Sequence, residues 1–307
     1  MKPAAALTLL DRARGAYLGL AIGDALGATV EFMTSGEIRH QYGVHREIIG
    51  GGWLRLKPGQ VTDDTQMSLA MGEAIINAGA FDLKAIADAW AAWLRSRPID
   101  VGNTCRRGIQ RYLIDGSLSK EACEGDGGNG ALMRNLPVIL LAHDDPQRRV
   151  EWSLQQAHLT HHHPLSDAAV VAFAHLTADL LAGAAPEVIR DHADTLVASH
   201  RCFRFDPYPR RSSGYVVDTV QTTLDAFFTT GDFEACLLRA VKWGGDADTN
   251  GAIAGWLAGA AYGAGAIPAR WLKKLDPDVR ASVDNQANLL VAMNGSRPES
   301  VIEMTQT

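Results

Sequence analysis

The chain has 307 residues, of which 47% are apolar and 21% charged, a composition typical of soluble globular proteins. This length allows one large domain or two medium ones with a sizeable buried core. The 29 lysine and arginine residues stand against 35 aspartate and glutamate residues, giving a net charge of -6. Because no basic run or stripe occurs, nucleic acid is excluded as an expected partner.

The cysteines show no CxxC spacing, which favours reduced thiols and a cytoplasmic protein. They are Cys105, Cys123, Cys202 and Cys236. Residues 1–15 contain a short apolar run without the hydrophobic region and cleavage site of a signal peptide. We therefore expect a cytoplasmic protein, with any membrane association occurring through a partner.

Two expected helices each carry four glycines spaced four residues apart. These are Gly15, Gly19, Gly23 and Gly27 in residues 14–28, and Gly251, Gly255, Gly259 and Gly263 in residues 250–264. A glycine inside a helix costs roughly 0.5–1 kcal/mol relative to alanine, so an offsetting gain is needed. Because this spacing aligns the glycines on one ridge, we expect both helices to form the tight centre of the fold, with each other as candidate partners.

Helical periodicity predicts further long helices along the chain. Residues 83–96 place apolar side chains on one face, and residues 164–183 begin with proline and end with glycine, as helices commonly do. Residues 276–295 are another candidate that ends in glycine. The one candidate strand, residues 46–56, contains three consecutive glycines, which favour a loop.

No linker or solenoid repeat divides the chain, so we predict a single compact all-α, multi-helix domain over residues 1–307, with a polar tail after about residue 295. Residues 249–269 carry no charge and are long enough to span a bilayer. They consist mainly of alanine and glycine, however, so we predict a buried central helix and no transmembrane segment.

Two acidic segments each stand directly before an apolar helix. They are Thr62, Asp63 and Asp64, and Asp246, Asp248 and Thr249. One such segment is ordinarily a helix cap, since Asp and Thr accept hydrogen bonds from the first turn. Two segments with more carboxylates than a cap uses suggest that the helix ends meet. Four carboxylates in contact repel unless cations balance them, and oxygen ligands select Mg²⁺ or Mn²⁺. A pair of such ions can activate water.

Several motifs together resemble the ADP-ribosylglycohydrolase family, in the family's order and over nearly the whole chain. They are GAYLGLAIGDALGATVEF, VTDDTQMSLAM, GNGALMRNLPV, LTHHHP, GYVVDTVQTTL and WGGDADTNGAIAGWLAGA. The resemblance implies an all-α bundle around a dinuclear Mg²⁺ or Mn²⁺ centre, in an enzyme that removes ADP-ribose from modified protein side chains. It implies as metal ligands the six residues Thr62, Asp63, Asp64, Asp246, Asp248 and Thr249.

The resemblance also implies roles for acidic residues outside these segments. It places Glu31 beside the metals, to move a proton or hold the attacking water; a solvated carboxylate at a helix end is the alternative. It assigns Asp100 to bind the guanidinium of an arginine substrate, which a carboxylate can accept in bidentate fashion. A plain N-cap for a helix near Gly102 is the alternative for Asp100. We predict that Asp24 is a buried structural hydrogen-bonding group.

Residues 124–135 contain G-x-G-x-x-G at Gly125, Gly127 and Gly130, but no preceding strand supports a Rossmann fold. As a glycine-rich loop opening a helix, this segment would present N–H groups to a diphosphate, with Asn129 and Gly130 as the contacts. An idle surface loop is the alternative.

The histidines of AHLTHHHPL are His158, His161, His162 and His163. A zinc cluster would need partners such as cysteine or a carboxylate, which this crowded stretch does not show. The family usually has one histidine after the threonine, which corresponds to His161 here, so the resemblance implies that His161 contacts the ligand. We predict that the other two histidines of the triplet, His162 and His163, are surface or packing residues. Tyr215 is implied to lie against ribose or adenine, with a core tyrosine as the alternative.

The implied reaction is hydrolysis of the N-glycosidic bond between ADP-ribose and a protein arginine, with two divalent ions, Mn²⁺ or Mg²⁺, as cofactors. Members of the family in nitrogen control imply ADP-ribosylated nitrogenase iron protein as the substrate and a PII-type protein as a regulator. The alternatives are a dinuclear-metal phosphoester hydrolase and a non-catalytic ADP-ribose-binding or scaffold protein. Asp100 and the lack of a Lys/Arg cluster near the motifs disfavour the first, and both intact acidic segments disfavour the second.

Overall fold

The computed structural model describes residues 7–294, and this part of the chain consists of helices joined by loops. No strand occurs within it; β-type pairing there is confined to isolated bridges. The predicted all-α fold in a single compact domain is confirmed. The predicted polar tail after about residue 295 lies outside the described residues.

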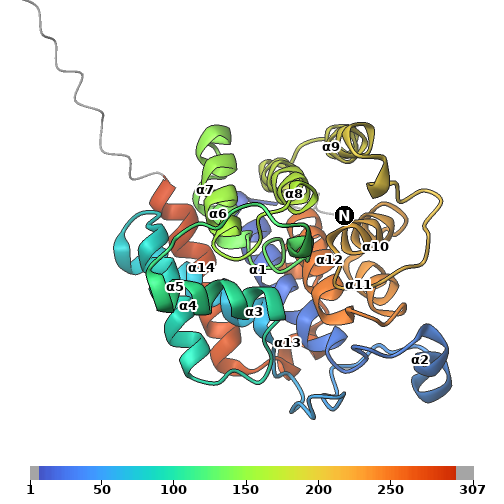
Figure 1. Cartoon of the computed structure of the whole chain (residues 1–307). Helices are drawn as coiled ribbons and strands as arrows, with labels where there is room; N and C mark the ends of the chain where they lie inside the picture. The colour runs from blue at the N-terminus through green and yellow to red at the C-terminus, as the bar shows by residue number, and fades with distance from the viewer. Residues whose placement is uncertain (1–6, 295–307) are drawn as a thin grey trace, which may run out of the picture.

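In chain order the helices are α1 (Leu9–Gly27), α2 (Ser35–Tyr42), α3 (Asp63–Ala78), α4 (Leu83–Arg95), α5 (Asn103–Asp115), α6 (Leu136–Leu141), α7 (Pro146–His158), α8 (Pro164–Ala182), α9 (Pro186–Ser199), α10 (Val216–Phe228), α11 (Phe233–Val241), α12 (Ala247–Tyr262), α13 (Ala269–Lys274) and α14 (Pro277–Asn294). Short 3₁₀ helices cover Glu124–Asp126, Arg201–Phe203 and Ala264–Ala266. The helices α3, α4 and α5 lie on one side of the molecule, and α9, α10 and α11 lie on the other (Figure 1).

The helices α1 and α12 pack against each other through the middle of the molecule (Figure 1). Their glycines face each other in antiparallel register: Gly15 with Gly259, Gly19 with Gly255, and Gly23 with Gly251. A Cβ atom at any of these positions would overlap a backbone carbonyl of the partner helix, so only glycine permits this approach. The predicted pairing of the ridges is confirmed. Gly263, predicted within the helix, instead terminates α12 with φ +76°.

The helix α12 is buried along almost its whole length, from Ala247 to Ala260, which confirms the prediction of a buried central helix. The helix ends at Tyr262, so the charge-free segment is not one continuous helix. Within residues 7–294, α8 is the helix whose length and composition would allow it to cross a membrane, and 56% of its most apolar window is buried inside the fold.

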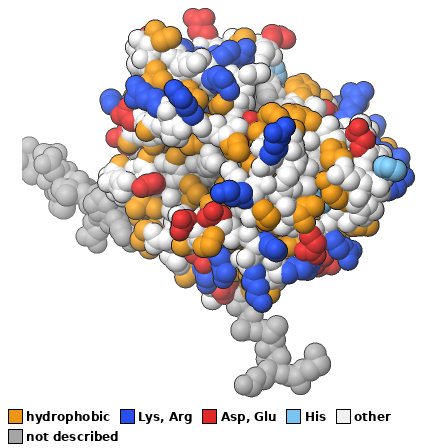
Figure 2. All heavy atoms as spheres, turned by 90° about the horizontal axis from the view of Figure 1, so that it is seen from below, with side chains coloured by type: hydrophobic (Ala, Val, Ile, Leu, Met, Phe, Trp, Pro, Cys, Tyr) orange, Lys and Arg blue, Asp and Glu red, His pale blue; other side chains and the backbone are white. Residues whose placement is uncertain are grey.

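The remaining predicted elements also appear in the structure. Ile86, Ala87 and Trp90 form the buried face of α4, as the periodicity indicated. The helix α8 ends at Gly183 in the left-handed conformation. Residues 46–56 form a loop with tight turns, so the glycine-based prediction is confirmed. On the face seen in Figure 2, acidic and basic side chains are interspersed with apolar ones, and neither charge gathers there.

Candidate active site

The two acidic segments meet in the folded chain, although about 180 residues separate them. The Thr62 hydroxyl lies 3.3 Å from Asp64 Oδ2 and 3.4 Å from Asp248 Oδ2. The Thr249 hydroxyl donates to Asp64 Oδ2 at 3.2 Å. We call the six residues of these segments the acidic centre: Thr62, Asp63, Asp64, Asp246, Asp248 and Thr249.

Helix capping does not explain the acidic centre. Thr62 and Asp246 are the N-cap residues of α3 and α12, yet neither side chain makes a capping hydrogen bond. The start of α3 is instead held by Asp24 of α1, which accepts hydrogen bonds from the backbone N–H and hydroxyl groups of Thr62 and Thr65. These contacts fit the structural role predicted for Asp24, and they leave the carboxylates of α3 available for other partners.

Each carboxylate of the acidic centre has a different surrounding. Asp63 Oδ2 accepts the Gly102 N–H at 2.9 Å, and Asp246 Oδ2 accepts a short hydrogen bond from Asn129 Nδ2. Asp64 Oδ1 is buried and has no hydrogen-bond partner among residues 7–294. A buried carboxylate oxygen without a donor is costly, and a cation is a partner that would satisfy it.

Glu31 reaches the acidic centre from the loop after α1. Phe32 N–H donates to the Gly245 carbonyl at 2.6 Å, and Gly245 N–H donates to the Met33 carbonyl at 2.9 Å. Gly244 and Gly245 have positive φ angles, and a Cβ atom on either would overlap a facing carbonyl, so this close junction needs glycine. One oxygen from each of Glu31, Asp100 and Asp248 lies within 4.8 Å of the other two.

Neither simple alternative for Glu31 and Asp100 fits the structure. Glu31 is only 5% exposed, so it is not a solvated carboxylate at a helix end. Asp100 Oδ1 accepts the Val101 N–H at 2.7 Å, while the N-cap of α5 is Gly102, without a side-chain capping bond. The Asp100 side chain therefore does not cap α5. It is half-buried and lies at the acidic centre.

Burial and mutual repulsion favour protonated carboxyl groups here when no cation is present. Burial raises the pKa of Glu31 to about 8 and the pKa of Asp63 to about 7, and the neighbouring carboxylates add to both shifts. Burial, followed by the adjacent carboxylates, raises the pKa of Asp64 and of Asp248 well above the ordinary range. Divalent cations would relieve this repulsion, and the oxygen-only donor set fits Mg²⁺ or Mn²⁺.

A cavity of about 440 Å³ opens above the acidic centre. It is lined by Glu31, Phe32, Trp53, Asp63, Asp100, Val101, Gly102, Asn103, Thr104, Cys105, Arg106, Gly128, Asn129, Gly130, Met133, His161, Gly214, Asp246, Asp248 and Thr249. The structure thus brings most of the predicted site residues to one cavity. Thr62 and Asp64 lie beneath this lining, in contact with Asp248 and Thr249.

The glycine-rich loop forms one wall of the cavity. Asn129 Nδ2 donates to Thr219 and to Asp246, so this side chain also holds the acidic centre in place. A Cβ atom on Gly130 would crowd the Cys105 sulfur and the His161 ring, so the wall packs tightly. The prediction that the loop opens a helix was wrong: turns follow it, and α6 begins only at Leu136.

The histidines separate into different environments. His161 is 2% exposed and lines the cavity, and its Nδ1 lies 2.7 Å from the Thr160 hydroxyl. Burial, followed by the charge of Arg134, lowers the pKa of His161 well below its ordinary value, so the ring is neutral. His163 caps α8 by accepting the Leu165 N–H. His158 and His162 lie outside the cavity lining.

Tyr215 is not a core residue, because it is 44% exposed. It precedes α10, pairs with Gly128 through an isolated bridge, and places its ring beside Gly127. It lies next to the glycine-rich wall but outside the cavity lining.

Two aromatic residues at the cavity were not predicted from the sequence. Trp53 Nε1 donates to Glu31 Oε2 at 2.6 Å, and the rings of Trp53 and Phe32 are 5.2 Å apart. Both are more than half exposed, at 52% and 65%. A large aromatic residue directly after three glycines, in GGGWL, was the available signal for Trp53.

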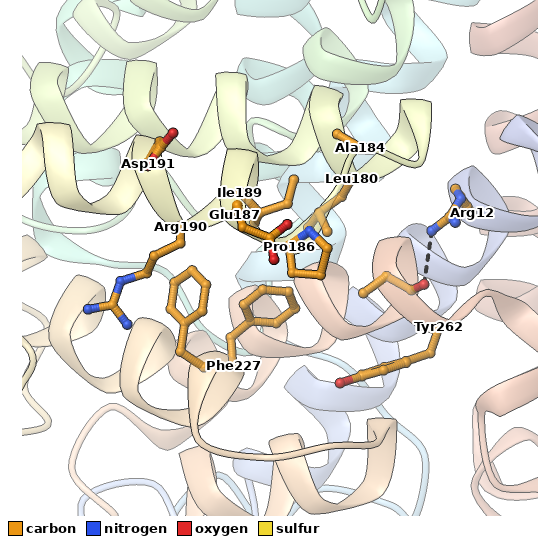
Figure 3. A pocket seen from close by; sticks show the side chains of 12 residues that line it. Arg12, Leu180, Ala184, Pro186, Glu187, Ile189, Arg190, Asp191, Phe227 and Tyr262 are labelled. Carbon is orange, nitrogen blue, oxygen red and sulfur yellow. Dashed lines mark hydrogen bonds between the residues drawn. The ribbon is translucent and has the colours of Figure 1, made fainter.

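A second cavity, of about 670 Å³, lies between α8, α9, α10 and the ends of α1 and α12 (Figure 3). Arg12 and Arg190 lie at opposite ends of this cavity. Arg12 donates to the carbonyls of Ala260 and Ala261, and Arg190 pairs with Asp194. Because both guanidinium groups already have partners, this cavity lacks the convergent free groups of the first.

A model of the ADP-ribosylglycohydrolase family matches residues 5–299. The chain belongs to the ADP-ribosylglycohydrolase family. A relative from Rhodospirillum rubrum, an ADP-ribosyl-dinitrogen reductase glycohydrolase, is 53% identical over 93% of this chain and 97% of its own length. An ADP-ribosylarginine hydrolase from Serratia proteamaculans is 34% identical over 89% of this chain and 77% of its own length.

The fold is also similar to that of a family member of known structure. A chain described as an ADP-ribosylglycohydrolase-related protein complex aligns with a TM-score of 0.83 and 36% identity, covering 93% of this chain and 99% of that one. The family resemblance drawn from the motifs is confirmed. The roles assigned to individual site residues stay predictions.

Proposed function

We propose that this chain hydrolyses the N-glycosidic bond that joins ADP-ribose to a protein arginine. The observation that carries this proposal is the convergence of Glu31, Asp100 and Asp248 at one cavity, in a chain of the ADP-ribosylglycohydrolase family. The Serratia proteamaculans relative, an ADP-ribosylarginine hydrolase, supports arginine as the linked residue. The Rhodospirillum rubrum relative further supports ADP-ribosylated dinitrogen reductase, the nitrogenase iron protein, as the protein substrate.

Two divalent cations, Mn²⁺ or Mg²⁺, are the proposed cofactors. The residues that would hold them are those of the acidic centre: Thr62, Asp63, Asp64, Asp246, Asp248 and Thr249. When bound, the cations supply Lewis-acid polarisation of ribose hydroxyls and water. The unpartnered Asp64 Oδ1 and the raised pKa values of the neighbouring carboxyl groups support this assignment.

Asp100 is proposed to hold the departing arginine. Its carboxylate borders the cavity, and its Oδ1 accepts a hydrogen bond from Val101 N–H. A planar guanidinium can donate two parallel N–H bonds to such a group, which fixes the scissile bond relative to the acidic centre. Negative charge around the cavity also stabilises the positive charge that develops on the ribose ring during glycoside hydrolysis.

Glu31 is proposed to take the proton from the attacking water. Trp53 Nε1 holds one of its oxygens at 2.6 Å, which leaves the other oxygen for a water molecule. A carboxyl group whose pKa is raised toward neutrality exchanges protons efficiently at the working pH. Trp53 is thus a positioning residue for Glu31.

The glycine-rich wall is proposed to bind the rest of ADP-ribose. Asn129 and Gly130 line the cavity on this wall, and the neutral His161 ring faces the same space. Tyr215, which is exposed beside Gly127, is proposed to stack on the adenine or to lie against a ribose.

The alternative functions receive less support. Among the described residues that line the cavity, Arg106 is the only lysine or arginine. One cationic side chain provides few charge-assisted hydrogen bonds for binding a phosphoester. A scaffold protein would not need six residues of metal-ligand type at a cavity. The cytoplasmic location, the absence of nucleic-acid binding and a PII-type regulator stay predictions.

The proposal is tested by assaying the purified chain on ADP-ribosyl-arginine, ADP-ribosyl-serine and simple phosphoesters, with and without Mn²⁺. We expect Mn²⁺-dependent release of ADP-ribose from the arginine conjugate alone. Faster turnover of a phosphoester, or equal turnover after removal of divalent ions, would contradict the proposal.

A further inference from the structure

A second cluster of metal-ligating side chains lies outside the cavity. It consists of His158 at the end of α7, His162 in the loop before α8, and Asp167 in the first turn of α8. One ligand atom from each residue lies within 4.8 Å of the other two. His158 Nε2 is 3.1 Å from Asp167 Oδ2, and all three residues are half-buried, so an ion can enter from solvent. We call these three residues the histidine cluster.

A hydrogen bond fixes the tautomer of the His162 ring. Its Nδ1 lies 2.6 Å from the Lys120 carbonyl. Because a carbonyl oxygen only accepts hydrogen bonds, Nδ1 carries the hydrogen, and in the neutral ring the lone pair is on Nε2. Histidine ligands in metal sites commonly donate their other ring N–H to a backbone carbonyl in this way, which fixes both the tautomer and the ring direction.

Asp167 provides the carboxylate that the sequence pattern around the histidines did not reveal. Its Oδ2 faces His158, while its Oδ1 is buried and has no hydrogen-bond partner within the part of the chain that the structure describes. Lys120, whose carbonyl lies against the His162 ring, pairs its ammonium group with Asp126. The cluster therefore offers one negative charge and one unpartnered oxygen to a bound cation.

We propose that His158, His162 and Asp167 form a binding site for one zinc-type divalent cation, separate from the acidic centre. Two imidazoles and a carboxylate are a donor set that suits Zn²⁺ and that Mg²⁺ disfavours. Ligands of a tetrahedral zinc ion lie about 3.3 Å apart for bonds of about 2.0 Å, so the 3.1 Å between His158 Nε2 and Asp167 Oδ2 already matches that spacing. The His162 ring stacks on the His158 ring, with centroids 3.8 Å apart, and would have to turn for its Nε2 to bind the same ion. Water would complete the coordination.

A cation bound at the histidine cluster would stabilise the segment of His162, which contacts the glycine-rich wall of the cavity. Cys123 N–H donates to the His162 carbonyl, and Asp126 accepts the His162 N–H, so the cluster holds the loop that leads into Gly127 and Gly130. His161, which lines the cavity, is adjacent to His162 in the chain. The proposal concerns binding and does not depend on the proposed hydrolase activity.

The test is equilibrium dialysis of the chelator-treated full chain against Zn²⁺ in excess Mg²⁺, with bound zinc measured by elemental analysis. We expect the wild-type chain and the His40→Ala control, which removes an exposed histidine of α2, to bind one more zinc ion than His162→Ala and Asp167→Asn. The affinity of the cluster variants should fall by at least the roughly 10–100-fold that loss of an outer-shell partner costs. Asp248→Asn should retain the additional ion.

Asp167→Asn keeps the size and hydrogen-bonding capacity of the side chain, so a purely structural His158–Asp167 contact survives it, whereas a zinc site does not. Zn²⁺ should also raise the Tm of the wild-type chain and of Asp248→Asn, but not that of Asp167→Asn. Equal zinc content in wild type and both cluster variants would overturn the proposal, as would loss of the ion in Asp248→Asn alone.

Discussion

Replacement of Gly23 by alanine perturbs the close backbone contact between α1 and α12. Gly23 lies on α1 opposite Gly251 of α12, and a Cβ atom there would overlap the Gly251 carbonyl and crowd Ala252 N. These are backbone atoms, so no side-chain rotation can relieve the overlap, and the two helices must separate locally. Separation would also loosen Asp24, the next residue, which holds the start of α3.

The expected loss follows from two opposed effects. Overpacking in a close contact costs about 1–3 kcal/mol, while alanine gains roughly 0.5–1 kcal/mol over glycine inside a helix. Because the clash is with backbone, we expect the cost to lie near its upper end, for a net loss of about 2 kcal/mol. That is a large share of the roughly 5–15 kcal/mol by which a typical domain is stable.

The assay is equilibrium urea unfolding followed by circular dichroism, with divalent ions chelated. Gly265→Ala is the matched control, since a Cβ atom there meets nothing within 4 Å. Its free energy of unfolding should stay within about 0.5 kcal/mol of wild type. If Gly23→Ala is as stable as the wild-type chain, or more stable, the argument from the glycine ridge fails.

Three further predictions concern the site. Trp53→Phe removes the hydrogen bond to Glu31 and should lower kcat about tenfold with little change in KM, since a hydrogen bond to a charged group contributes about 1.5–3 kcal/mol. The control is Trp93→Phe, which removes a hydrogen bond to Gln66 and should leave kcat unchanged. Asp100→Asn should lower kcat/KM for ADP-ribosyl-arginine by about 100-fold, because a charge-assisted bidentate contact is lost, and an unchanged value would remove Asp100 from the substrate site. The pKa of Asp63 is raised to about 7 and that of Glu31 to about 8, so without cations the folded chain binds more protons than the unfolded chain above about pH 4. The urea midpoint of the chelated chain should therefore decrease as the pH rises from about 5 to about 8, and Mn²⁺ should increase the midpoint most at about pH 8. A midpoint that increases with pH in chelator would refute this prediction.

The sequence was most informative where a local pattern determines the contact. The four-residue spacing of the glycines predicted the α1–α12 contact, because it aligns positions without a side chain along one face, where the backbone of another helix can come close. The doubled acidic segments predicted that the starts of α3 and α12 meet, because four carboxylates exceed what capping requires. Both predictions rest on a cost that only tertiary structure can offset.

The sequence was less informative where loops determine the geometry. Nothing local indicated that Gly244 and Gly245 would hold the loop of Glu31, or that Trp53 would donate to that carboxylate. Asp167 is near the histidines in sequence, but its place in the first turn of α8 makes it their partner only once that helix forms. The short helix α6 begins after turns that no periodicity revealed.

In the proposed reaction, the acidic centre binds the metal ions on which hydrolysis depends. The most direct measurement is the Mn²⁺ content and the rate of ADP-ribose release from ADP-ribosyl-arginine for the wild-type chain and for Asp248→Asn, whose carboxylate lies near Thr62, Glu31 and Asp100. We predict two Mn²⁺ ions per wild-type chain, and loss of both metal and activity in a variant that remains folded. Undiminished release by Asp248→Asn, or by wild type in chelator, would contradict the central claim.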